Sequence, residues 1–139
     1  MLGNCTLHSA KTAGRIVTQA ASTVFSISRA MTKARLAKLW RSDTRFSVSY
    51  QKQAAKALRN IRAILNQLPS TRYICPTEVP APCKNEAFPK TALNREFESI
   101  LKLKLPKGLK HIAKAFPQER KAFLAELDKQ PNTYTYCPK

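Results

Sequence analysis

The sequence predicts an all-α protein, a small, extended helical chain in which two helical blocks are joined by a proline-rich irregular segment. Apolar residues recur at steps of three and four before residue 69 and again after residue 90, which is the spacing of one face of an α-helix. Five prolines fall between residues 69 and 89, a density that no regular helix accommodates. The 139 residues suffice for one small domain with extensions.

Residues 1–42 form a basic segment with no carboxylate, seven Lys or Arg, and many Ser, Thr and Ala. The apolar residues of its expected helix follow steps of three or four along one face: Ile16, Ala20, Val24, Ile27 and Met31. An acid-free amphipathic segment that carries Arg is typical of a mitochondrial transit peptide, and a basic nucleic-acid-binding arm has the same composition. We therefore predict an N-terminal arm or an uncleaved transit-like segment.

For residues 43–69 we predict a basic amphipathic helix. Pro69 ends it, because proline has no amide hydrogen and disfavours the α conformation in the preceding residue. The apolar positions fall within about 120° of one another at 100° per residue: Ala54, Ala57, Leu58, Ile61, Ile64, Leu65 and Leu68. Four cations lie on the opposite side: Lys52, Lys56, Arg59 and Arg62. Because like charges at these spacings repel one another, such a row indicates an external polyanion.

For residues 70–90 we predict an extended, polyproline-like connector.

For residues 91–139 we predict a second helical block and a short tail. Apolar residues at helical spacing support that block: Leu93, Phe97, Ile100, Leu101, Leu109, Ile112, Ala113, Phe116, Ala122, Phe123, Leu124 and Leu127. The tail alternates as a strand does, but it has too little length to make a sheet.

The four cysteines are Cys5, Cys75, Cys83 and Cys137. No secretory signal is visible in the first 30 residues, so a disulfide-stapled secreted fold is not expected. We expect partly buried free thiols. The alternatives are a disulfide between Cys75 and Cys83, and a zinc site formed by Cys75, Cys83, His111 and Cys137, whose spacing matches metal motifs poorly.

The sequence contains few residues that could form a catalytic site. The two histidines, His8 and His111, have no acidic neighbour in the sequence, and the three glycines form no phosphate-binding loop. The sequence therefore predicts a protein that is not an enzyme and has no cofactor.

A formal charge of +17, from 25 Lys or Arg against 8 Asp or Glu, indicates an anionic partner. No apolar run approaches the ~20 residues of a spanning helix, so no transmembrane segment is expected. The residues predicted to contact RNA phosphates are Lys33, Arg35, Lys38, Arg41, Lys52, Lys56, Arg59 and Arg62. Trp40, Phe46 and Tyr50 lie among these cations and are candidates for stacking on bases.

These features favour a structural, non-catalytic subunit of a large mitochondrial assembly. The first hypothesis is an rRNA-contacting mitochondrial ribosomal protein, held by neighbouring subunits in the matrix or on the matrix side of the inner membrane. The second is an accessory subunit of a respiratory-chain or ATP-synthase complex, where the cations meet acidic proteins and anionic lipid. The third is a DNA-condensing virion or chromatin protein.

Overall fold

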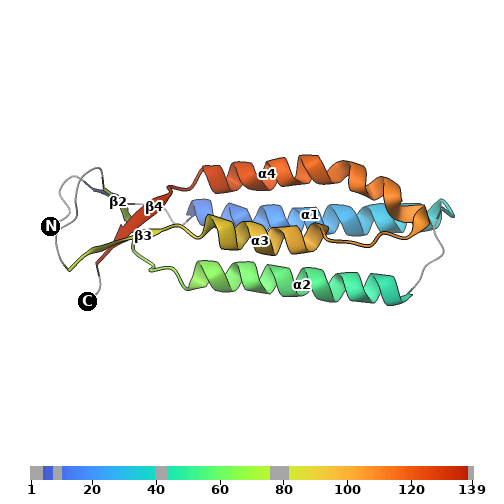
Figure 1. The fold of residues 1–139 in the computed structure, drawn as a ribbon, viewed down its shortest axis with the longest axis horizontal. Helices are drawn as coiled ribbons and strands as arrows, with labels where there is room; N and C mark the ends of the chain where they lie inside the picture. Colours follow the sequence, from blue (N-terminus) through green and yellow to red (C-terminus); the bar gives the residue numbers. More distant parts are fainter. Residues whose placement is uncertain (1–4, 8–10, 40–43, 76–81, 138–139) are drawn as a thin grey trace.

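The computed structural model describes residues 5–7, 11–39, 44–75 and 82–137. Within these ranges four α-helices run along the long axis of the molecule, and a four-stranded antiparallel sheet closes one end (Figure 1). The prediction of a mainly helical protein is therefore confirmed, but the chain is not purely all-α.

The elements follow one another as β1 (Thr6–Leu7), α1 (Lys11–Leu36), α2 (Thr44–Asn66), β2 (Tyr73–Ile74), β3 (Lys84–Ala87), α3 (Lys90–Leu101), the 3-10 helix η1 (Lys107–Ala115), α4 (Phe116–Asp128) and β4 (Thr133–Tyr136). Consecutive α-helices run in opposite directions (Figure 1). Helix α1 packs against α2 and α4, and α3 packs against the same two helices. The result is an up-down-up-down bundle.

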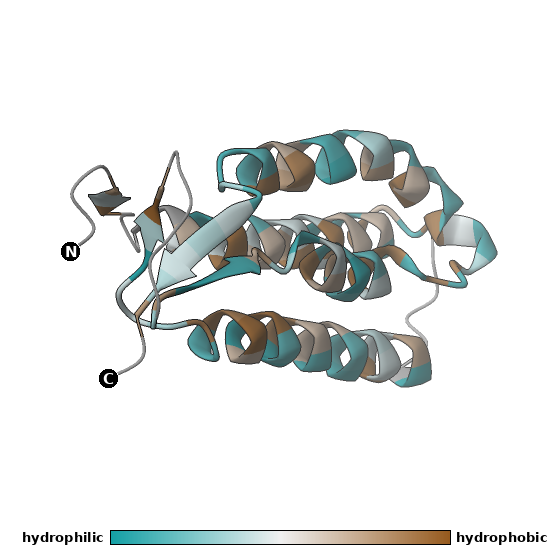
Figure 2. Ribbon diagram, turned by 60° about the vertical axis from the view of Figure 1, so that its left-hand side comes forward, coloured by the Kyte–Doolittle hydropathy of each residue, from teal (hydrophilic) through white to brown (hydrophobic). Residues whose placement is uncertain are grey.

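A single hydrophobic core runs through the bundle. Its fully buried large side chains come from every part of it: Ile16, Ile61, Leu93, Phe97, Ile100, Leu109 and Phe123. Apolar and hydrophilic residues alternate along each helix in Figure 2, as amphipathic helices require. The two helical blocks expected from the sequence thus share one core, although Ala113 and Leu124, predicted on the buried side of the second block, are exposed.

Helix α1 occupies much of the segment predicted as an N-terminal arm. Ile16, Ala20, Ile27 and Met31 are buried, as the periodicity predicts. Thr23 is also fully buried, and its hydroxyl donates a hydrogen bond to the Glu119 carboxylate of α4 at 3.1 Å. Because these side chains belong to the core, α1 is part of the folded bundle and does not extend from it.

Helix α2 confirms the predicted basic amphipathic helix. Ala54, Ala57 and Ile61 are buried. The remaining predicted apolar positions are partly buried and pack against the core: Leu58, Ile64, Leu65 and Leu68. The helix ends three residues before Pro69.

The connector and the tail form strands, contrary to the sequence-based expectation. Strands β2 and β3 come from residues 70–90, and β4 comes from the tail and lies between them in the order β1-β2-β4-β3. Strands β3 and β4 pair over four residues, from Lys84 opposite Tyr136 to Ala87 opposite Thr133. Each strand is too short to be stable alone, but four segments distant in sequence complete one sheet. Residues 76–81 lie outside the described part of the chain.

Two disulfides correct the prediction of free thiols. Cys5 bonds to Cys75, and Cys83 bonds to Cys137. The strand register explains both pairs, because the residues next to them in sequence already lie opposite one another, Thr6 with Ile74 and Lys84 with Tyr136. The alternatives of a Cys75–Cys83 bond and a zinc site are also wrong, since no cysteine keeps a free thiol.

The end of α1 adopts a left-handed turn at Lys38, whose φ is 59°. The Leu39 amide donates to the Ala34 carbonyl at 2.9 Å, and the Lys38 amide donates to the Arg35 carbonyl at 3.0 Å. This pair of bonds is the Schellman motif, which usually places glycine at the left-handed position. Lysine there carries a steric cost at its Cβ.

Replacing Lys38 with glycine is expected to raise the free energy of unfolding by about 0.5–1 kcal/mol. The left-handed conformation costs a side chain roughly 1–2 kcal/mol, and the larger backbone entropy of glycine in the unfolded state offsets part of the gain. Urea unfolding followed by circular dichroism measures the change. Lys38→Ala removes the same charge but keeps the Cβ, so an equal gain from both variants would contradict the explanation.

Candidate polyanion-binding surface

The predicted row on α2 is exposed. Lys52, Lys56, Arg59 and Arg62 all lie on the outer side of the helix. Ten residue steps separate the first from the last, about 15 Å at 1.5 Å per residue. None of the four forms a hydrogen bond or an ion pair within the described part of the chain. The row is therefore a line of cations available to an external partner.

The other predicted contacts lie elsewhere. Lys33, Arg35 and Lys38 are exposed at the end of α1 that lies opposite the sheet (Figure 1). Arg41 lies outside the described residues, as does Trp40. The structure thus brings four of the eight predicted residues into one row and puts three others on the last turn of α1 or directly after it.

The stacking candidates are not free on the surface. Tyr50 is only 2% exposed. Phe46 is half-buried and packs against the core. Both lie on the side of α2 that faces the bundle, so the described surface offers neither ring as an open stacking platform.

Two further lysines, which the sequence analysis did not single out, flank α2. Lys102 and Lys104 follow α3 and are exposed. Lys102 and Lys56 line one groove of about 360 Å³ between α2 and α3. Both new lysines line a second depression of about 360 Å³ farther toward the start of α2. The alternation of leucine and lysine in residues 101–105 was a signal for them, because it puts both lysines on one side of an extended segment.

Gln53 holds this lysine segment against α2. Its side-chain amide donates to the Lys102 carbonyl at 3.0 Å and also to the Ser99 carbonyl. Because the last carbonyls of a helix have no partner within the helix, this glutamine caps α3 from the neighbouring helix. The cap fixes where Lys102 leaves α3.

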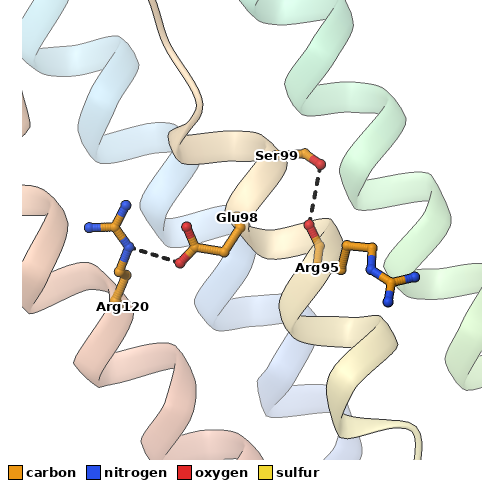
Figure 3. A network of polar contacts seen from close by, with 4 residues as sticks. All are labelled: Arg95, Glu98, Ser99 and Arg120. Atoms are coloured by element: carbon orange, nitrogen blue, oxygen red, sulfur yellow. Dashed lines mark hydrogen bonds and ion pairs between the residues drawn. The ribbon is translucent and has the colours of Figure 1, made fainter.

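Each glutamate in the described part of the chain forms a hydrogen bond or an ion pair within the fold. Glu98 of α3 pairs with Arg120 of α4 at 2.8 Å, while the Ser99 hydroxyl donates to the Arg95 carbonyl beside it (Figure 3). Glu96 accepts a hydrogen bond from the Asn60 amide at 2.9 Å. Residues 44–77 contain no Asp or Glu. Helices α1 and α2 therefore have no carboxylate of their own to neutralise their cations.

A second group of polar side chains lies in the sheet. Glu86 accepts hydrogen bonds from the hydroxyls of Tyr134 at 3.1 Å and Tyr136 at 3.0 Å. Burial and the bond to Glu86 raise the pKa of Tyr134 to about 12. Arg72 is 5% exposed, and burial lowers its pKa. These contacts hold the sheet together and involve none of the predicted RNA-contacting residues.

The remaining candidate residues are the two histidines. His111 is exposed on η1, and His8 lies outside the described residues. In the described part of the chain no group of three or more His, Cys, Asp or Glu could hold a metal ion. No helix there is both long and apolar enough to cross a membrane.

No protein-family model matches the chain, and no curated protein or solved structure matches it either. The function is therefore inferred from the charge and the geometry of the surface.

Proposed function

We propose that this protein is a non-catalytic polyanion-binding protein whose main contact is the row of Lys52, Lys56, Arg59 and Arg62. The supporting observation is that all four cations are exposed in line, on a helix that has no carboxylate and without a partner in the described residues. A nucleic-acid strand rises about 3.4 Å per phosphate in a duplex, so a row of about 15 Å spans roughly four phosphates.

The binding energy comes from the release of counterions. Each phosphate that a lysine or arginine neutralises frees condensed salt ions, so affinity falls as salt concentration rises. Lys102 and Lys104 extend the positive field on one side of α2. This mechanism recognises a chain of charges and reads no base sequence, since base readout needs side chains directed at base edges.

An RNA partner follows from the sequence analysis, which favours a subunit of a mitochondrial ribosome. On that proposal α2 lies along rRNA phosphates, and the opposite side of the bundle, which carries both charge signs on α4, contacts neighbouring subunits.

A sulfated polysaccharide is a second candidate, and the two disulfides favour it. Disulfides form and persist in oxidising compartments and are rare where glutathione and thioredoxin keep thiols reduced. The compartment that this candidate requires differs from the mitochondrial matrix. Sulfate groups offer the same chemistry to α2 as phosphate groups do.

The proposal is tested with the variant Lys52→Gln plus Arg59→Gln, titrated against a single-stranded RNA oligonucleotide and against heparin. For RNA, losing two contacts should reduce the slope of log K against log salt by about 1.4, which corresponds to roughly 20-fold weaker binding at 0.1 M salt. Fluorescence anisotropy at four salt concentrations measures both quantities. The ligand that binds more tightly at equal ionic strength identifies the better class of partner.

The matched control is Lys121→Gln on α4 plus Lys129→Gln directly after it, which changes the net charge by the same amount. Helix α4 also carries Glu119, Glu126 and Asp128, so its surface has mixed charge. This control should leave the slope within about 0.3 of the unsubstituted protein. An equal loss from both pairs would show that binding follows net charge, and the assignment to α2 would fail.

A further inference from the structure

A small groove lies between the second half of α1 and the first half of α2. Six polar side chains line it, together with Met31: Ser28, Thr32, Arg35, Ser47, Tyr50 and Gln51. Its volume is about 180 Å³. A water molecule takes about 30 Å³ in the liquid, so the groove has room for a small ion with part of its hydration shell.

Among the described residues the lining is rich in hydrogen-bond donors and contains no carboxylate. Arg35 brings a guanidinium with five N–H groups, and Ser47 and Gln51 bring a hydroxyl and an amide. These three side chains have no hydrogen-bond partner in the described part of the chain. The Thr32 hydroxyl, in contrast, already donates to the Ser28 carbonyl at 3.2 Å. The groove therefore has an excess of donors over acceptors.

Tyr50 gives an independent indication that an acceptor is missing. The residue is 2% exposed, and its buried hydroxyl has no hydrogen-bond partner among the described residues. Burial raises the pKa of Tyr50 well above its ordinary value, so the hydroxyl stays protonated and able to donate. Buried polar atoms are nearly always hydrogen-bonded, and leaving one unpaired costs about 1–3 kcal/mol. Tyr50 lines this groove as well as the depression on its other side, so its unpaired hydroxyl is a donor without an acceptor in the described part of the chain, beside two surface hollows.

We propose that this groove binds one tetrahedral oxoanion group, a phosphate or a sulfate, with Arg35 as its ion-pair partner and Tyr50, Ser47 and Gln51 as hydrogen-bond donors. A guanidinium matches two oxygens of such a group at once. Four oxygens on one centre also supply acceptors in several directions, which an excess of converging donors requires. The site goes beyond the cationic row, since Lys52, Lys56, Arg59 and Arg62 do not line it.

Inorganic phosphate is the probe, titrated into the full oxidised chain at constant ionic strength and followed by amide NMR shifts. We expect saturable shifts confined to residues around the groove. Arg35→Gln should weaken binding at least tenfold, because it removes the only charged group that the described residues contribute to the lining. Lys33→Gln makes the same change of charge on the same helix but outside the groove, and it should leave the affinity within about twofold.

Tyr50→Phe separates a binding role from a structural one. It removes one oxygen and keeps the ring, so it should not lower the urea midpoint of the free protein, since the lost hydroxyl had no partner. It should nevertheless weaken phosphate binding about tenfold, as expected for a lost hydrogen bond to a charged group.

Three results would overturn the site: shifts that never saturate, an unchanged affinity in Tyr50→Phe, or a loss in Lys102→Gln that is absent in Arg35→Gln. The last would place the anion in the depression on the other side of Tyr50, which Lys102 lines.

A competition experiment then identifies where the bound phosphate or sulfate group comes from. If RNA or heparin displaces phosphate, the groove takes one group of the polyanion, and if neither does, it takes the free anion. Either result supports the site, and neither depends on the row on α2.

Discussion

Reduction of both disulfides is expected to lower the free energy of unfolding by about 8 kcal/mol, which is comparable to the whole stability of a typical domain. The bonds close chain segments with sequence separations of 70 and 54 residues. Loop-closure entropy predicts about 4 kcal/mol for each. The loops run from Cys5 to Cys75 and from Cys83 to Cys137 and do not overlap, so their effects on the unfolded chain should add. The reduced protein should therefore be largely unfolded under conditions in which the oxidised protein is folded.

Urea unfolding of two paired variants measures the separate contributions. Cys5→Ser plus Cys75→Ser removes the first bond, and Cys83→Ser plus Cys137→Ser removes the second, and each variant leaves no unpaired thiol from the bond it removes. Dithiothreitol should have no effect on a variant that lacks all four cysteines. If reduction leaves the urea midpoint of the unsubstituted protein unchanged, the bonds do not contribute to stability as proposed.

Truncating Phe123 to alanine is expected to cost about 3–5 kcal/mol, since it opens a cavity at the centre of the core. Phe123 of α4 and Phe97 of α3 are both fully buried. Their rings stack with centroids 4.1 Å apart and planes 7° apart. The pair joins the two helices of the second block, so its loss removes both buried area and a specific ring contact.

Phe25→Ala is the matched control, because Phe25 lies on α1 and is 66% exposed. Its cost should stay within about 0.5 kcal/mol. A double-mutant cycle with Phe97→Ala should give a coupling energy of about 0.5–1.5 kcal/mol for the ring pair. Equal costs for Phe123→Ala and Phe25→Ala, measured by urea unfolding, would contradict the core described here.

The two disulfides and the proposed anion-binding groove lie toward different ends of the molecule. Both disulfides lie at the sheet end, whereas Arg35 and the first part of α2 lie toward the opposite end (Figure 1). Because the four cations of the row are exposed, substituting them should change polyanion affinity while changing the free energy of unfolding by no more than a few tenths of a kcal/mol.

Local patterns predicted a good part of the fold. The burial of Ile16, Ala20 and Ile27 on α1, and the exposure of Lys52 and Arg59 on α2, follow from the 3.6-residue period. That period is a property of a helix before it packs. Pro69 likewise limits α2 through its own backbone chemistry. None of these features needs a partner segment, and so a window of consecutive residues contains the information.

The sheet, the disulfides and the polar groove depend on contacts between distant segments. Two-residue strands such as Tyr73–Ile74 give no measurable periodicity, and Cys83 meets Cys137 only because β3 pairs with β4 in one register. Tyr50 looks like an exposed ring among cations in the sequence, yet it is buried and lines a groove with Arg35 of α1. The sequence by itself determined which helices form and which faces are charged, because these are short-range properties. Tertiary packing alone decided which cysteines bond and which polar atoms lack a partner, because both depend on the position of chain segments tens of residues away.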